Sequence, residues 1–375
     1  MAPTHDLLRR PRSLPPEALI REKNHMIEEA VQNISPVDNA WLERAAERQS
    51  QLTKPPGSLG ALEEVANRLA AIRRTLRPVV FRQRVYVVAA DHGVVAEGVS
   101  AYPREVTAQM VYNFLRGGAA ISVLGRDCGI EVEVVDAGVD ADFGDAPGLI
   151  QTKVVRGTAN FTRGPAMTRE QAERSVAVGV ELARAAAAGG VEMIGVGEMG
   201  IGNTTSASAI TAALTGLAPE AVTGYGAGVD EAGWRRKVSA VRRALEINKP
   251  DRNDSLDLLA KIGGAEIGVM AGLVLGAAAE RIPVVADGFI STSAAALACL
   301  LCPNASDYLF IAHRSQEAGH DALIEFIGRR PLLDLQMRLG EGTGAALAMR
   351  LIGSAARLLG EMATFAEAGV SDRDS

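Results

Sequence analysis

The stretch VYVVAADHG, residues 85–93, begins with six largely apolar residues and then changes abruptly to Asp91, His92 and Gly93. An unbroken apolar run of this length is typical of a strand buried on both faces of a parallel sheet. Four similar runs follow, separated by alanine-rich stretches of helical length, at residues 132–135, 193–197, 283–286 and 308–312. This alternation predicts an α/β fold, a doubly wound parallel sheet with helices on both faces.

A titratable group follows each of these runs. The five groups are Asp91, Asp136, Glu198, Asp287 and His313. The carboxyl ends of parallel strands share one edge of the sheet, and open α/β sheets bind ligands at that edge. A single acid there could be a helix cap, but five such groups favour a ligand site. The sequence therefore predicts that the chemistry takes place at this edge.

Composition excludes some classes of protein. The 375 residues include 39 basic and 45 acidic side chains, a net charge of −6, which argues against a nucleic-acid-binding protein. The most membrane-like run, residues 263–281, carries Glu266 and is predicted to be a buried core helix. The N-terminal residues show no apolar core of signal-peptide length, and the three cysteines suggest no disulfide framework. We therefore expect a cytoplasmic protein that does not bind membranes.

Residues 195–205, GVGEMGIGNTT, contain the pattern G-x-G-x-x-G between a predicted strand and a predicted helix. The pattern formally matches a dinucleotide fingerprint. However, Glu198 lies inside the turn, where its charge would repel a pyrophosphate. A single phosphate at the start of the helix is favoured instead, bound by backbone N–H groups and the hydroxyls of Thr204 and Thr205.

A second glycine loop, at residues 224–228, precedes a basic helix that contains Lys237. Lys237 could meet a phosphate held near the glycines. Alternatively, Arg235, Arg236 and Lys237 form an ordinary solvated helix face.

Glu341 stands between Gly340 and Gly342, just before a predicted helix. One interpretation is that its carboxylate simply complements the helix dipole, which is worth about 0.3–1 kcal/mol. The other is that the flanking glycines leave room for a ligand beside a carboxylate that points into a cleft.

Nine motifs in this order resemble one known family, over roughly residues 40–365. They are LTKPPGSLGALE (52–63), ADHGV (90–94), SAYPREVTAQMV (100–111), RGGAAI (116–121), VGEMGIGNTT (196–205), NKP (248–250), VADGFISTSAA (285–295), HRSQEAGH (313–320) and MRLGEGTGAALA (337–348). The chain resembles the nicotinate-nucleotide:dimethylbenzimidazole phosphoribosyltransferases of the cobalamin lower-ligand pathway.

The resemblance implies a Rossmann-like sheet, a small helical domain built from both chain ends, and a homodimer. We expect an N-terminal extension at 1–37, a small helical domain from 38–80 and 330–375, and a large catalytic domain at 81–329. The extension is longer than the family resemblance implies, and it contains one predicted helix near 16–33.

The resemblance also implies the reaction. The phosphoribosyl group of nicotinate mononucleotide would move to a nitrogen of 5,6-dimethylbenzimidazole, giving nicotinate and alpha-ribazole 5'-phosphate without a metal or other cofactor. By the same resemblance Glu341 is the general base. Glu198 lies near the reacting ribose, where it assists Glu341. Two further sets of residues are implied. The donor and its phosphate are assigned to Gly200, Asn203, Thr204, Gly226, Lys237, Asp287 and Ser315, and the aromatic acceptor to Tyr102, Val106, Gln109, Met110, Met199 and Leu339.

Two alternatives stay open at this point. The acceptor could be a phenol, adenine or another benzimidazole, because the motifs concern the donor and the base catalyst and do not identify the ring. A non-catalytic nucleotide-binding module is a second alternative, although such a module would tolerate the loss of Glu341.

Overall fold

The computed structural model describes residues 16–371, and for residues 16–24 it describes the backbone alone. Its centre is a seven-stranded, all-parallel sheet in the order β3-β2-β1-β4-β5-β6-β7. The strands are β1 (Gln83–Ala90), β2 (Glu131–Gly138), β3 (Leu149–Gln151), β4 (Met193–Met199), β5 (Val284–Ala286), β6 (Leu309–His313) and β7 (Pro331–Leu333). The prediction of a doubly wound parallel sheet is confirmed.

The five apolar runs correspond to the five inner strands, while the two edge strands gave no signal in the sequence. Both β3 and β7 have three residues and are partly exposed, so neither needs a continuous apolar run. Strand β7 pairs with β6 and lies beyond residue 329. The assignment of the whole segment 330–375 to the small helical domain is therefore wrong for residues 331–333.

The strand order reverses between β1 and β4. The chain moves outward from β1 through β2 to β3, returns to place β4 on the other side of β1, and continues outward to β7. In sheets of this kind a crevice opens beyond the carboxyl ends of the strands at the reversal point, because the connections leave in opposite directions. The ends of β1 and β4 are therefore the expected place for a ligand.

Helices cover both faces of the sheet. On one face lie α11 (Ala265–Ala279) and α12 (Phe289–Leu301), with α6 (Arg169–Ala188) packed outside α11. On the other face lie α5 (Ala120–Cys128) and α14 (Thr343–Glu361). The remaining elements are η1 (Gly93–Glu97), α4 (Val106–Leu115), α7 (Asn203–Thr215), α8 (Pro219–Val222), α9 (Glu231–Asn248), α10 (Ser255–Ile262), η2 (Pro303–Tyr308) and α13 (His320–Ile327).

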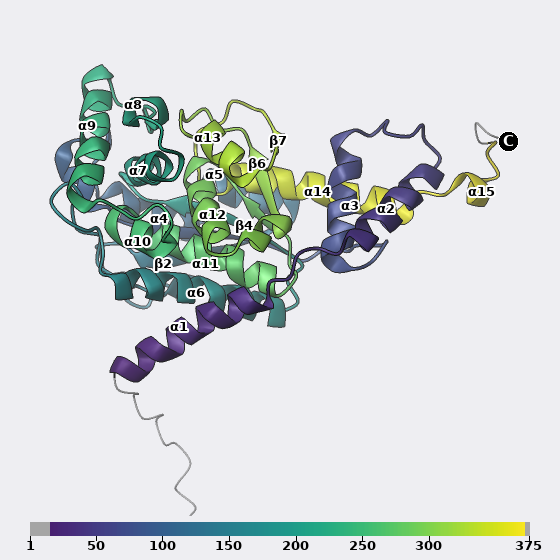
Figure 1. The fold of residues 1–375 in the computed structure, drawn as a ribbon, viewed down its shortest axis with the longest axis horizontal. Helices are drawn as coiled ribbons and strands as arrows, with labels where there is room; N and C mark the ends of the chain where they lie inside the picture. The colour runs from purple at the N-terminus through teal and green to yellow at the C-terminus, as the bar shows by residue number, and fades with distance from the viewer. Residues whose placement is uncertain (1–15, 372–375) are drawn as a thin grey trace, which may run out of the picture.

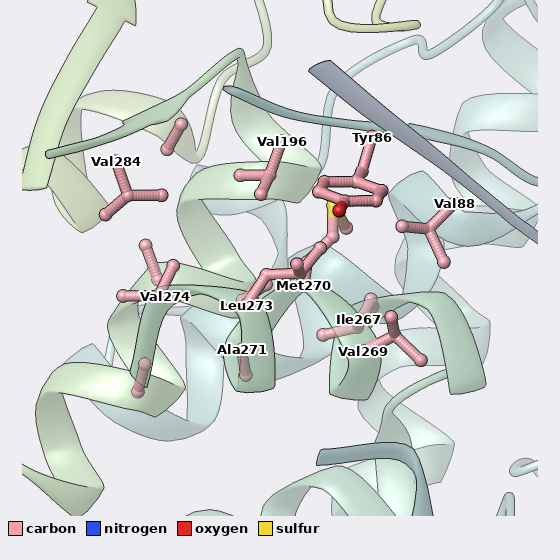
Figure 2. Packing of buried hydrophobic residues seen from close by; sticks show 14 of the residues in the cluster. Tyr86, Val88, Val196, Ile267, Val269, Met270, Ala271, Leu273, Val274 and Val284 are labelled. Carbon is pink, nitrogen blue, oxygen red and sulfur yellow. The ribbon is translucent and has the colours of Figure 1, made fainter. Parts of the chain in front are cut away.

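Helix α11 accounts for the membrane-like run. Its side chains are buried from Ala265 to Ala278, and Figure 2 shows Met270 and Val274 turned toward strand residues such as Tyr86 and Val196. On its other side α11 lies very close to α6, and glycine permits this approach: a Cβ at Gly272 would lie 1.9 Å from the backbone oxygen of Val176. The prediction of a buried core helix is confirmed. Within residues 16–371, no helix is both long enough and apolar enough to cross a membrane.

A separate helical lobe is formed by both ends of the chain (Figure 1). It contains α2 (Asn39–Gln51), α3 (Ala61–Arg73), the end of α14 and the short α15 (Phe365–Ala368). Leu52 forms an isolated antiparallel bridge with Thr364, and Arg48 donates to the backbone oxygen of Leu359 at 2.7 Å. Helix α14 begins at the sheet and ends in this lobe, so it connects the two parts of the molecule.

The helix predicted near 16–33 is confirmed as α1 (Pro16–Asn33). It packs on α6 and α11, and its C-terminal half and the following turn bury Ile27, Ala30 and Ile34. This part of the N-terminal extension therefore covers the core of the large domain. Residues 1–15 lie outside the described part of the chain.

Candidate active site

A cleft of about 520 Å³ opens at the carboxyl ends of β4, β5 and β6. Twelve of the fifteen predicted site residues line it: Tyr102, Val106, Met110, Glu198, Met199, Gly200, Asn203, Thr204, Gly226, Ser315, Leu339 and Glu341. Gln109, Lys237 and Asp287 are not among the residues that line this cleft. Segments far apart in the sequence thus meet at the predicted edge of the sheet.

Glu341 occupies a tight turn that aims its side chain into this cleft. Gly340, Glu341 and Gly342 all have positive φ angles, of 85°, 63° and 85°. A left-handed conformation is unfavourable for a glutamate, so the surrounding structure must impose it. The side chain is 7% exposed, and its Oε2 atom has no hydrogen-bond partner among the described residues. Burial raises the pKa of Glu341, and the charge of Asp287 raises it further, while a backbone hydrogen bond at Ile121 opposes the shift.

Asp287, and not Glu341, caps helix α14. Its two carboxylate oxygens accept from the backbone N–H groups of Gly342 at 3.0 Å and Ala345 at 2.9 Å. Asp287 is 1% exposed, and its Oδ1 lies 3.8 Å from Nε2 of His313. The assignment of Asp287 to the donor and its phosphate is therefore not supported: its carboxylate holds the turn that carries Glu341 and does not line the cleft. Because Asp287 already accepts from the N–H groups at the start of α14, a helix-capping role does not explain Glu341.

Glu198 packs against the same turn from the end of β4. Asn203 donates its side-chain amide to Glu198, and a Cβ on Gly340 would lie 2.3 Å from the Oε1 atom of Glu198. Burial raises the pKa of Glu198 to about 8, and the charges of Glu266, Asp287 and Glu341 add to the effect, while Asn203 opposes it. The cleft therefore holds two carboxyl groups on adjoining backbone segments, and glycine at position 340 allows their close approach.

Lys237 reaches this region from beneath the glycine loop. It is 1% exposed, whereas Arg235 and Arg236 on the same helix are exposed, so a solvated face does not explain it. Its Nζ donates to the Thr204 hydroxyl at 2.9 Å and lies 2.8 Å from where a Cβ on Gly226 would be. Burial lowers the pKa of Lys237 to about 8, and Glu317 partly opposes this.

The start of α7 lies beside Lys237, and together they form the polar end of the cleft. Its N-cap residue, Gly202, offers no side chain to the first backbone N–H groups of the helix. A helix start of this kind attracts anions through its N–H groups and its dipole. Thr204, in the first turn, joins it to Lys237. This helix start is where the sequence predicted a single phosphate, but of the two predicted hydroxyls only that of Thr204 lines the cleft, because Thr205 is fully buried.

The opposite wall of the cleft is apolar. Val106 and Met110 lie four residues apart on one face of α4, and Met199 is the last residue of β4. Tyr102 and Leu339 stand at the mouth, 51% and 57% exposed. The placement of Gln109 in this wall is not supported, because its side chain is exposed and does not line the cleft.

Several lining residues were not predicted individually. They are Ile201, Ala227, Gly288, Phe289, Ile290, Ser291, Glu317, Arg338 and Gly340, whereas His313 was expected here as one of the groups at strand ends. Most of them fall inside the quoted motifs, so the signal was present, but the motifs alone do not separate lining residues from supporting ones. His320 is a supporting residue: its Nδ1 accepts from the Ser315 backbone at 2.8 Å, its Nε2 donates to Thr292, and burial lowers its pKa to about 3.

Two of the five groups at strand ends serve other purposes. Asp136 forms an ion pair with Lys153 at 2.7 Å, and Asp91 accepts from the backbone of Asp140 at 2.8 Å. Neither lines the cleft. Asp287 does not line the cleft either, so of the five groups only Glu198 and His313 do, while Asp91 and Asp136 stabilise the loops after β1 and β2.

Comparison with known proteins shows the family to which the chain is related. The phosphoribosyltransferase family model matches residues 34–370. The nicotinate-nucleotide–dimethylbenzimidazole phosphoribosyltransferase of Geobacter metallireducens is 56% identical over 345 residues, covering 92% of this chain and 98% of that protein. The chain belongs to this family. The Geobacter sulfurreducens protein of the same name is 55% identical over 349 residues, covering 93% of this chain and 99% of that protein.

The fold of this family member agrees with a solved structure. The crystal structure of the enzyme of that name from Thermus thermophilus superposes with a TM-score of 0.85 at 52% identity. The match covers 89% of this chain and 99% of that chain. The family resemblance and the fold predicted from the sequence are both confirmed.

Proposed function

We propose that the cleft transfers the phosphoribosyl group of nicotinate mononucleotide to a nitrogen of 5,6-dimethylbenzimidazole, giving alpha-ribazole 5'-phosphate and nicotinate. Family membership supports the pentosyltransferase reaction and its two substrates. The observation that carries the proposal is Glu341, a buried carboxylate whose Oε2 atom has no hydrogen-bond partner among the described residues, placed in a cleft that is polar at one end and apolar along one wall.

The polar end binds the donor in this proposal. The phosphate lies at the start of α7, where Gly200, Asn203 and Thr204 line the cleft and Lys237 supplies a positive charge from below. Ser315 and Gly226 complete this end of the site. The ribose then lies between the phosphate and the two carboxyl groups, Glu198 and Glu341.

The reaction needs one proton acceptor. The bond between C1' and the pyridinium nitrogen breaks, its electron pair returns to the ring, and nicotinate leaves without needing a proton. A benzimidazole nitrogen attacks C1' from the opposite face, which gives the alpha product. Glu341 accepts the proton from the other ring nitrogen, and its negative charge favours the cationic character that develops at C1'.

The raised pKa of Glu341 suits this role, because a general base works best when its pKa lies near the operating pH. Glu198, whose pKa is about 8, is mostly protonated at neutral pH and can donate a hydrogen bond to a ribose hydroxyl. The two carboxyl groups therefore have different roles, and Glu198 assists by positioning the ribose.

The apolar wall accepts the planar base. Val106, Met110 and Met199 offer a surface for an aromatic ring, with Tyr102 and Leu339 at the entrance. The proposal requires no redox cofactor, because no step changes an oxidation state, and no metal to activate the leaving group, because nicotinate leaves as a neutral pyridine ring. We also propose a cytoplasmic homodimer, with a small helical domain and a large catalytic domain; the three free thiols are in keeping with a reducing compartment.

A panel of acceptors tests the proposal. The purified enzyme is mixed with nicotinate mononucleotide and with 5,6-dimethylbenzimidazole, unsubstituted benzimidazole, adenine or a phenol, and the products are identified by mass spectrometry. We expect nicotinate release only with an acceptor, and fastest with dimethylbenzimidazole. If the donor binds but no acceptor releases nicotinate, the cleft is only a nucleotide-binding site. Faster reaction with a phenol or adenine would reassign the acceptor.

A further inference from the structure

Glu317 is a third carboxyl group in the cleft, and the proposed reaction does not use it. Its side chain lines the cleft, is 8% exposed, and has an Oε2 atom without a hydrogen-bond partner among the described residues. It follows Ser315 by two residues, and a Cβ on Gly224 would lie 2.2 Å from its Oε2 atom. The carboxyl group is therefore held against the glycine loop that precedes the helix of Lys237.

The charges around Glu317 belong to the polar end of the cleft. Burial raises the pKa of Glu317, while Lys237, Arg338 and a backbone hydrogen bond at Gly226 oppose the shift. Both cations make their hydrogen bonds elsewhere, Lys237 to Thr204 and Arg338 to the backbone oxygen of Gly226 at 3.2 Å. The other titratable groups that line the cleft are Tyr102, Glu198, His313 and Glu341. Glu317 thus stands beside the groups proposed to bind the phosphate.

A carboxylate in this position has a definite chemical consequence. Two ionised groups, a carboxylate and a phosphate, repel each other strongly when both are removed from water. One shared proton converts that repulsion into a charge-assisted hydrogen bond. A phosphomonoester has its second pKa near about 6, so it can hold such a proton close to neutral pH. Sulfate and phosphodiesters have no acidic proton to share there.

We propose that Glu317 shares a proton with the bound anion and so selects a phosphomonoester over fully ionised anions such as sulfate or a phosphodiester. The inference rests on the proposed function, which places a phosphate at this end of the cleft. Lys237 and Arg338 balance the negative charge that remains, and Glu317 discriminates between anions of similar size. The residue is a specificity determinant and takes no part in breaking or making the bond at C1'.

Competition by two simple anions tests this role. Inorganic phosphate and sulfate are titrated at pH 7 and constant ionic strength against the donor in the nicotinate-release assay. Inorganic phosphate carries at least one proton at this pH, and sulfate carries none. Lys237 attracts both anions, so the ratio of their inhibition constants reports the effect of Glu317 alone. In the unmodified enzyme we expect phosphate to inhibit at least about tenfold more strongly, the usual effect of one hydrogen bond to a charged group.

Glu317→Gln should remove the discrimination. Without the carboxylate, sulfate is no longer repelled, and the two inhibition constants should come within about threefold of each other. Glu325→Gln, an exposed position on the adjacent helix α13, is the matched control and should keep the ratio of the unmodified enzyme. A purely structural Glu317 would instead lower the melting temperature or weaken both anions by the same factor.

The outcomes separate this inference from the proposed function. If the unmodified enzyme releases nicotinate normally but phosphate and sulfate inhibit equally, or neither competes, the inference fails and the function stands. A ratio that survives in Glu317→Gln also overturns it. If no acceptor supports nicotinate release, the proposed function fails first. The comparison of anions in the unmodified enzyme needs no variant, so an unstable Glu317→Gln protein would still leave a decisive result.

Discussion

Replacing Glu341 with glutamine should abolish most turnover without weakening the fold. Glutamine keeps the size of the side chain and one acceptor oxygen, but it neither takes the benzimidazole proton nor offers negative charge to C1'. A positioned general base typically contributes about 10²–10⁴-fold, equivalent to about 2.7–5.5 kcal/mol of activation free energy. We expect kcat to fall by that factor while the donor dissociation constant changes little.

The structure also sets the expected effect on stability. The buried Oε2 of Glu341 has no hydrogen-bond partner among the described residues, so ionised glutamate gains little there from the folded state. For 375 residues the unfolding entropy is about 0.8 kcal/mol per kelvin, so a change of 1 kcal/mol moves the melting temperature by only about 1.3 °C. Loss of a dipole contact, about 0.3–1 kcal/mol, would therefore be small in a thermal melt and would leave the rate unchanged.

A pH profile supplies an independent test. Because burial raises the pKa of Glu341, its base form is lost as pH falls through a value above the usual 4.5, and kcat/KM should decline on that limb. The Glu341→Gln variant should lack the limb, and the Glu325→Gln control should retain it. A variant with near-normal kcat, or with the acid limb intact, would refute the assignment and make Glu198 the next candidate. A large fall in melting temperature would instead mean that the turn depends on this carboxylate.

Three further predictions concern the phosphate end, the second carboxyl group and the N-terminal helix. Lys237→Met should weaken donor binding at least tenfold in calorimetry and leave acceptor binding unchanged. In the unmodified enzyme, the affinity for the donor should fall as pH rises through about 8, because Lys237 in the folded protein loses its proton there. Glu198 has a folded pKa raised to about 8, so the folded state holds its proton more tightly and this carboxyl destabilises the fold as pH rises from about 4.5 to 8. Glu198→Gln should therefore raise the melting temperature relative to the unmodified enzyme at pH 8.5 and much less at pH 5, and equal shifts at both values would contradict the pKa. Deleting residues 1–37 removes the buried Ile27, Ala30 and Ile34 and should lower the melting temperature by several degrees. The proposed homodimer should still be detected by size-exclusion chromatography with light scattering, and a monomer seen only after the deletion would place the extension in the dimer contact.

The sequence predicted the inner part of the sheet well because burial on both faces demands continuous apolar strands. Strand β1 illustrates this: its buried residues pair with β2 on one side and β4 on the other. The edge strands β3 and β7 escaped prediction because each has a single neighbour and is partly exposed, so their backbone hydrogen bonds impose no apolar pattern. The same limit misplaced residues 331–333 in the helical domain.

The site residues also fall into those that local sequence marks and those that only packing distinguishes. The family resemblance, which rests partly on glycine-rich motifs, assigned Gly200, Gly226 and Glu341 to the site. Such motifs are recognisable because close backbone approach, as at Gly200, and positive φ angles, as at Gly226 and Glu341, leave a signature within a few residues. The burial of Lys237 left no such signature, because its three-residue run with Arg235 and Arg236 looks like any solvated helix face. Only the packing of α9 on α7 distinguishes them.

The roles of Asp287 and Glu341 could not be separated from sequence, because the contact that separates them spans 55 residues. Either acid could have capped α14, since both lie near its first turn in space. Asp287 accepts from the backbone N–H groups of Gly342 and Ala345, and it is buried there. With the helix start already satisfied, Glu341 gains nothing by turning back toward it, and the flanking glycines direct its carboxylate into the cleft. A buried carboxylate oxygen without a hydrogen-bond partner is costly to a fold, and that cost is understandable where a substrate supplies the missing partner.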